Sequence, residues 1–182
     1  MRLVAILIAG ALALPAHADE ISDTLQSALD AYADGDIQYA LEELDFAKQK
    51  LLELKTDSLG AFLPPAPEGW SFEKNSEMNS ALGMLGGGVG AEGTYSNGDG
   101  ASVKITLMAD NPMVGSMAAM ITNASAMGMK VERINRQRFA IQDQQMMALV
   151  ANRILIQTEG DLALAQQILE QMDFKAMANF GQ

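Results

Sequence analysis

The first part of the chain carries apolar side chains at the spacing of two amphipathic helices. Apolar positions recur every three or four residues through 21–33 and again through 37–54. Between these stretches lies Asp34-Gly35-Asp36, in which the glycine is typical of a helix end and an aspartate can cap the next helix. We therefore predict an antiparallel helical hairpin over residues 19–63. Its apolar positions are Ile21, Leu25, Ala28, Leu29 and Tyr32, followed by Ile37, Ala40, Leu41, Leu44, Ala47, Leu51 and Leu54.

The hairpin also resembles a known repeat unit. The segment from Ala28 to Asp36, followed by Ala40, resembles a single tetratricopeptide-type unit. One such unit cannot bury its own apolar face, and arrays of this kind need about three units. The hairpin is therefore expected to pack on the rest of the protein, on a copy of itself or on a partner. An uncovered face would favour a homodimer.

The rest of the chain predicts strands and helices in alternation. Pro64-Pro65-Ala66-Pro67 is predicted to be a stiff extended connector, which marks the start of a second domain over residues 64–182. Asn97-Gly98-Asp99-Gly100 is a strong signal for a hairpin turn. Pro112 is expected at the start of a helix. The predicted elements are strands at 69–72, 101–108, 131–134, 136–141 and 146–158, and helices at 112–127 and 161–172.

This order of elements predicts an antiparallel α+β sandwich with helices, preceded by the helical hairpin. Residues 64–175 resemble the Mog1/PsbP-like fold. The resemblance rests on Pro65-Ala66-Pro67-Glu68-Gly69-Trp70 before the first strand, on the mid-chain helix and on Ile154-Leu155-Ile156-Gln157 before the last helix. Proteins of that fold perform unrelated functions, so the resemblance implies a fold and transfers neither function nor site residues.

The N-terminus has the pattern of a secretory signal peptide. Arg2 precedes an apolar run over residues 3–14, and Ala16-His17-Ala18 has the small-x-small form of a cleavage site. We expect a signal peptide over residues 1–18, cleavage after Ala18 and a periplasmic or secreted protein. The run is shorter than the roughly 20 residues that cross a bilayer. No other stretch is long and apolar enough, so no membrane span is expected.

Charge and composition narrow the chemistry. The chain has 23 acidic and 12 basic residues and a net charge of −11, which disfavours binding to nucleic acid. It contains no cysteine, and its one histidine, His17, would leave with the signal peptide. Histidine-based triads, cysteine nucleophiles and histidine metal sites are then impossible. We therefore expect neither an enzyme nor a bound cofactor.

Methionine is the most unusual feature of the composition. Met113, Met117 and Met120 fall on one face of the helix predicted at 112–127. Thioethers are soft ligands that suit Cu(I), so these three residues are a candidate metal site. The same spacing is typical of core packing, because methionine fills irregular gaps. Both interpretations stay open.

Two further motifs have a structural and a functional interpretation. Arg133, Arg136 and Arg138 form a candidate face for an anion or an acidic partner, with Arg136 and Arg138 expected on the same side of one strand. The alternative is a solvated basic face. Residues 88–93 match a dinucleotide-binding glycine fingerprint, but that site needs a helix after the glycines and a β-hairpin is predicted here. We therefore interpret these residues as a flexible or closely packed glycine loop.

The leading hypothesis for function is a non-catalytic periplasmic interaction or binding module with a protein partner in the cell envelope. It rests on the missing catalytic residue types and on the hairpin that cannot bury its own apolar face. One alternative is a Cu(I)-binding envelope protein that uses the three methionines. The other is a carrier of a lipid or another apolar ligand, which predicts a cavity that opens near residues 78–90.

Overall fold

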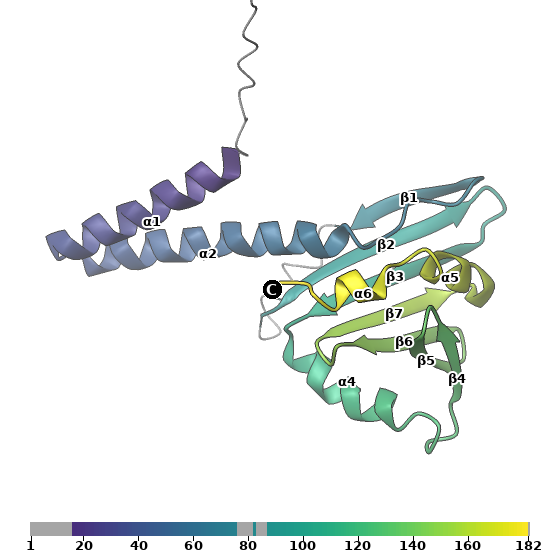
Figure 1. Cartoon of the computed structure of the whole chain (residues 1–182). Coiled ribbons are helices and arrows are strands. Elements are labelled where there is room, and N and C mark those ends of the chain that lie inside the picture. The colour runs from purple at the N-terminus through teal and green to yellow at the C-terminus, as the bar shows by residue number, and fades with distance from the viewer. Residues whose placement is uncertain (1–15, 76–81, 83–86, 182) are drawn as a thin grey trace, which may run out of the picture. The chain divides into compact units, whose positions relative to one another are not determined.

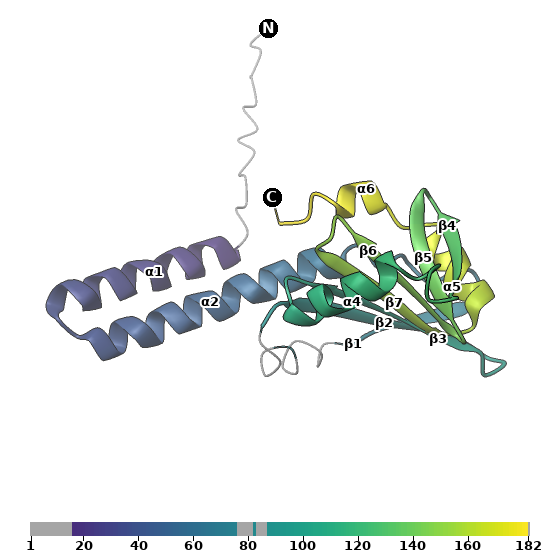
Figure 2. The same ribbon diagram turned by 90° about the horizontal axis from the view of Figure 1, so that it is seen from below.

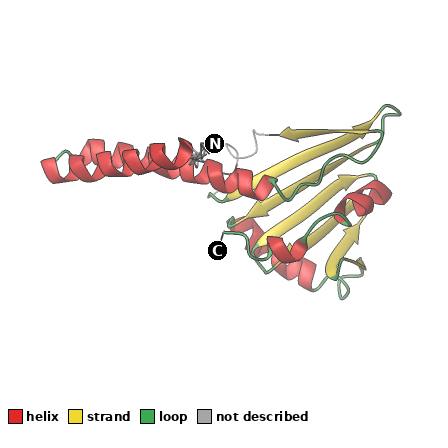
Figure 3. Cartoon of the chain, turned by 45° about the horizontal axis from the view of Figure 1, so that its top comes forward, coloured by secondary structure: helices red, strands yellow, loops and turns green. Residues whose placement is uncertain are grey.

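In the computed structural model, which describes residues 16–75, 82 and 87–181, the chain forms two compact units. The first unit is Met1–Leu51 and the second is Leu52–Gln182. A helical pair is followed by an antiparallel sheet with helices, which confirms the predicted α+β class (Figure 3). Residues 1–15 of the predicted signal peptide lie outside the described residues.

The first unit is the predicted helical hairpin. Helix α1 (Ala16–Asp34) packs antiparallel against the first part of helix α2 (Ile37–Gly60) (Figures 1 and 2). Small side chains are buried where the two helices meet. They are Thr24, Ala28 and Ala31 on α1 and Ala40 and Ala47 on α2. Ile21 is buried as well, whereas the other large apolar side chains of this unit remain exposed.

The turn between the helices follows from Asp34-Gly35-Asp36. Gly35 adopts the left-handed conformation with φ +83°. The amide of Gly35 donates to the carbonyl of Tyr32 at 3.2 Å, and the amide of Asp36 donates to the carbonyl of Ala31 at 2.9 Å. This is the Schellman arrangement that commonly ends a helix. The Asp36 carboxylate then accepts the amide of Tyr39 at 3.1 Å and caps α2.

The second unit contains a seven-stranded sheet in the order β1-β2-β3-β7-β6-β5-β4, with every neighbouring pair antiparallel. Strands β1 to β3 and strands β4 to β7 therefore form two meanders, which the β3–β7 pair joins. The strands are β1 (Trp70–Asn75), β2 (Val89–Asn97), β3 (Ser102–Ala109), β4 (Lys130–Ile134), β5 (Gln137–Gln142), β6 (Gln145–Val150) and β7 (Ile154–Gly160).

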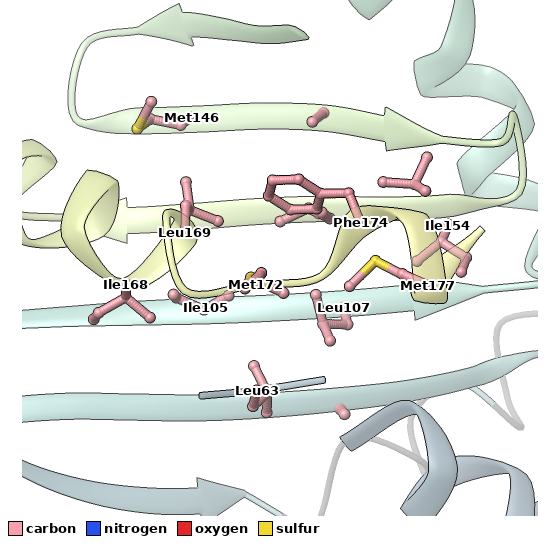
Figure 4. Close-up of a cluster of buried hydrophobic side chains, with 14 of the residues drawn as sticks. Leu63, Ile105, Leu107, Met146, Ile154, Ile168, Leu169, Met172, Phe174 and Met177 are labelled. Atoms are coloured by element: carbon pink, nitrogen blue, oxygen red, sulfur yellow. The ribbon is translucent and has the colours of Figure 1, made fainter. Parts of the chain in front are cut away.

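Helices cover both faces of the sheet. Helices α5 (Leu162–Leu169) and α6 (Phe174–Met177) lie on one face, called here the α5/α6 face (Figure 1). Figure 4 shows the main core there, where side chains of α5 and α6 meet those of the central strands. Helix α4 (Pro112–Thr122) packs on the other face, the α4 face, over a smaller apolar cluster. Labelled core residues include Ile105 and Leu107 on β3, Ile154 on β7, and Leu169 and Phe174 on the helices.

The boundary between the units lies inside α2, earlier than the Pro-rich connector at residue 64. Leu59, at the end of α2, is fully buried in the main core, and Leu63 is also part of it. The connector itself is fastened to the sheet, because the Tyr95 hydroxyl donates to the carbonyl oxygen of Pro64 at 2.7 Å. Residues 52–67 therefore belong structurally to the sheet unit.

The single strand predicted over 146–158 is wrong. The structure divides it into β6 and β7 with a turn at residues 151–153, where Ala151 and Asn152 have φ values of +49° and +56°. Arg136 likewise lies in the turn between β4 and β5, with φ +69°, so β5 begins one residue later than predicted. Neither turn contains glycine or proline, and the local signal in each is a single asparagine, Asn135 or Asn152, which tolerates the left-handed region.

The helix predicted over 112–127 ends earlier, at Thr122. Its start is as expected, since Asn111 caps it by accepting the amide of Met113 at 2.8 Å and Pro112 occupies the first turn. Residues 123–128 form turns instead of helix. The last predicted helix also ends early, at Leu169, and the short helix α6 after it was not predicted.

Candidate functional site

The hairpin carries an apolar groove of about 560 Å³ between α1 and α2. Every residue that lines it is apolar or aromatic, and the six largest expose 39–68% of their surface. These positions belong to the helical stripe that the sequence analysis identified. The lining residues of this apolar groove are Leu25, Ala28, Leu29, Tyr32, Ile37, Ala40, Leu41 and Leu44.

A second groove, of about 510 Å³, lies between the same helices and is acidic. The α1 residues that line the two grooves are on opposite sides of that helix, given 3.6 residues per turn. The hairpin thus separates its apolar surface from its negative charge. The lining residues of this acidic groove are Asp23, Gln26, Ser27, Asp30, Ala31, Asp34, Asp36 and Tyr39.

The three candidate copper ligands lie on α4, but two of them are used in packing. Met117 and Met120 are half-buried against the apolar cluster on the α4 face, which also contains Met108 and Met147. Met113 is exposed at the start of the helix. The environment of Met117 and Met120 favours a packing role, whereas Cu(I) binding by the three methionines stays a prediction.

The three candidate arginines come together near the end of α4. Arg133 and Arg138 are direct register partners on β4 and β5, so both project from the same face of the sheet. Arg136 and Arg138 line a hollow of about 280 Å³ with the α4 residues Ile121 and Thr122. The expectation that Arg136 shares a strand face with Arg138 is wrong, because Arg136 lies in the preceding turn.

Each of these arginines lies near another positively charged side chain. Within the described part of the chain, none of the three takes part in an ion pair. Like charges directly opposite each other on neighbouring strands repel. The hollow also lies at the C-terminal end of α4, where the helix dipole favours positive charge. The arginines therefore have two interpretations: a solvated basic face at the end of a helix, or a binding site for an anion.

The glycine fingerprint at residues 88–93 forms neither a nucleotide site nor a loop. Most of it belongs to strand β2, which pairs with β1 and β3, and no helix follows. A side chain at Gly93 would collide with the ring of Phe72 and approach Leu63. Gly93 is therefore required by close packing on the α5/α6 face.

A cluster that the sequence analysis missed joins four distant parts of the second unit. Asp110, just after β3, receives the ammonium of Lys55 at 2.7 Å and a guanidinium nitrogen of Arg153 at 3.1 Å. Arg153 also donates to the carbonyl oxygen of Phe180 at 3.3 Å. The hydrogen bond from Lys55, with further contributions from Arg153, lowers the pKa of Asp110. The network fastens the C-terminal segment to α2 and to the β6–β7 turn.

The described residues bear only in part on the remaining functional predictions. The cavity that a carrier would need was placed near residues 78–90, and of these only Leu82 and residues 87–90 are described; Leu82 is buried in the α4-face cluster. Within the described residues, no group of three or more acidic, histidine or cysteine side chains is arranged to hold a metal ion. The described helices are also too short or too polar to cross a membrane.

Comparison of the chain with protein-family models, with curated proteins and with solved structures finds no match. The resemblance of residues 64–175 to the Mog1/PsbP-like fold and of the hairpin to a tetratricopeptide-type unit therefore stay predictions. Function is therefore inferred from the surfaces of this chain, among which the groove of the hairpin is lined by apolar and aromatic side chains alone.

Proposed function

We propose that this protein is a non-catalytic interaction module of the cell envelope, which binds a protein chain through the apolar groove of its hairpin. The observation that carries the proposal is the lining of that groove, in which large side chains such as Leu29, Tyr32 and Leu41 are exposed together. Exposed apolar patches of this kind are typical of binding surfaces. The location in the envelope rests on the predicted signal peptide over residues 1–18.

The energetics support binding. Each of the six large side chains leaves on the order of 100 Å² in contact with water, and covering 100 Å² of apolar surface contributes about 2.5 kcal/mol. The buried residues of the first unit are mostly alanines, with Ile21 and Thr24, so the hairpin leaves most of its large apolar side chains exposed. A second chain that covers the groove would therefore stabilise both the complex and the hairpin.

Site-specific photo-crosslinking in the native host tests this function. A photoreactive residue is placed at Leu29 or Leu41 in the apolar groove, and at Tyr39 as the matched control. Tyr39 lies on the same helix as Leu41 and is 46% exposed, but it lines the acidic groove. We expect covalent adducts with a protein chain from the two groove positions and none from Tyr39. Absence of protein adducts at both groove positions would contradict the proposal.

A further inference from the structure

We propose that the occupant of the apolar groove is a second copy of this chain, so that two hairpins pair about a two-fold axis and form a four-helix bundle. This inference rests on the proposed function and names its partner. It is carried by three properties of the hairpin: the width of its apolar surface, the uncharged lining of that surface, and its exposed area.

The first property is width. Apolar side chains project from both helices, with Leu25, Leu29 and Tyr32 on α1 and Ile37, Leu41 and Leu44 on α2. A helix with its side chains is about 10 Å wide, so a single helix in the groove would leave the outer parts of both rows uncovered. A second hairpin has the same two-helix width. Its rows can lie in the groove of the first hairpin, as in antiparallel four-helix bundles.

The second property is charge. In a two-fold interface each residue faces the surface that its own copy provides, so a charged face would repel itself. The eight residues that line the apolar groove carry no charge. Four aspartates of the hairpin, Asp23, Asp30, Asp34 and Asp36, line the acidic groove on the other side. Pairing through the apolar groove therefore directs these carboxylates away from the interface.

The third property is area. The six large groove residues, which are 39–68% exposed, together leave roughly 600 Å² of apolar side chain uncovered, against about 800 Å² per partner in a stable interface. Leu51, which lies seven residues after Leu44 on the same side of α2 and is 50% exposed, extends this surface. The hairpin thus carries most of the area that one partner contributes to a stable dimer.

The decisive experiment measures the mass of the purified chain in solution by light scattering and sedimentation. We expect twice the chain mass of 19.4 kDa for the unprocessed chain, and correspondingly less after cleavage of the signal peptide. The double substitution Leu29→Glu with Leu41→Glu should weaken self-association at least about 100-fold, because it buries two carboxylates. Tyr39→Glu, on the acidic side of the same hairpin, should leave the dimer intact. A dimer that persists in the double variant would overturn the inference.

A second measurement does not depend on how well the acidic variants keep their helices. The sequence contains no cysteine, so a single cysteine can be placed at each groove position in turn. Near a two-fold axis a residue lies close to its own copy, and mild oxidation should then produce a disulfide-linked dimer. We expect this from at least one of Leu25, Leu29, Tyr32, Ile37, Leu41 and Leu44, and not from Tyr39→Cys. No crosslink at any groove position would contradict the two-hairpin bundle.

The two proposals fail in different ways. A monomeric chain whose groove positions still form adducts with another protein refutes the homodimer and leaves the interaction function standing. A monomeric chain without any adduct refutes both. A dimer that the groove substitutions dissociate, while Tyr39→Glu does not, supports both.

Discussion

The phenolic hydroxyl of Tyr95 donates a 2.7 Å hydrogen bond to the carbonyl oxygen of Pro64. Both residues are buried, and burial raises the pKa of the Tyr95 hydroxyl, so the bond stays intact at any physiological pH. It connects the last part of strand β2 to the segment that follows α2. The Pro-rich segment is therefore part of the sheet unit and not a free linker.

We predict that Tyr95→Phe lowers the free energy of unfolding by about 1–3 kcal/mol, because the buried carbonyl of Pro64 loses its donor. Urea denaturation measures the effect. Tyr39→Phe is the matched control. Because Tyr39 is exposed, removing its hydroxyl should change the free energy of unfolding by less than about 0.5 kcal/mol. Equal stability of the two variants would mean that the hydrogen bond contributes nothing net.

We predict that Asp110 makes the free energy of unfolding depend on pH. Its pKa in the folded protein is lowered from the ordinary value of 3.8, chiefly by the hydrogen bond from Lys55. A depressed folded pKa means that the stabilisation is present above the unfolded value and is lost as the pH falls through the folded one. Asp110→Asn should remove this part of the acid sensitivity and, since two partly exposed ion pairs are lost, cost about 1 kcal/mol near neutral pH.

Asp143→Asn provides the control for that experiment. Asp143 also has a positive φ, of +52° against +54° at Asp110, and asparagine tolerates this conformation as aspartate does. Thermal unfolding from neutral pH to below pH 4 should show the wild-type slope in Asp143→Asn and a shallower one in Asp110→Asn. If stability falls with pH at the same rate in the wild type and in both variants, Asp110 is not the source of the acid sensitivity.

Reversing the charge of one arginine in the pair on β4 and β5 should raise the free energy of unfolding. Arg133→Glu or Arg138→Glu turns a repulsive cross-strand pair into an attractive one, which we expect to raise stability by about 0.2–1 kcal/mol at low salt. The double reversal should lose the gain, and added salt should reduce it. Lys175→Glu, at an exposed position on α6, controls for net charge. A gain from Lys175→Glu equal to the others would show that the register pair is irrelevant.

The methionines of α4 should tolerate leucine. The triple variant Met113→Leu, Met117→Leu and Met120→Leu is expected to change the unfolding free energy by less than about 1.5 kcal/mol per buried site, because leucine has nearly the same volume. If the residues serve packing, calorimetric titration with Cu(I) under reducing conditions gives the same weak signal for both proteins. Tight binding by the wild type that the triple variant loses would instead establish the copper site.

Local patterns in the sequence predicted the elements that have local causes. The hairpin follows from a three-four apolar spacing and the Asp34-Gly35-Asp36 turn, and α4 begins at Asn111-Pro112 as expected. The β6–β7 turn was missed because Ala151 and Asn152 interrupt an apolar stretch without glycine or proline. Two consecutive residues in the left-handed region form a tight hairpin turn here, and Asn152 is the one residue of the pair that favours this conformation.

The candidate sites, too, could be predicted only where neighbouring residues in the sequence form them. The apolar groove could be anticipated because its two walls are contiguous helices whose periodicity is visible in the sequence. The cluster of Lys55, Asp110 and Arg153 could not, because its members are far apart in the chain and no spacing connects them. Packing of Met117 and Met120 on the sheet was one of two interpretations that the sequence left open, since core and ligand spacing on a helix are identical.

The order of strands in the sheet has a consequence for the speed of folding. Within each meander, β1 to β3 and β4 to β7, neighbouring strands follow one another along the chain, so they can zip as local hairpins at a small cost in chain entropy. The β3–β7 pair joins strands that are far apart in the chain, because Val103 pairs with Gly160. Closing that long loop around α4 and strands β4 to β6 is the slow, entropically costly event, and it sets the contact order of the whole sheet. The transition state for folding should therefore contain two preformed meanders at the moment when β3 and β7 meet.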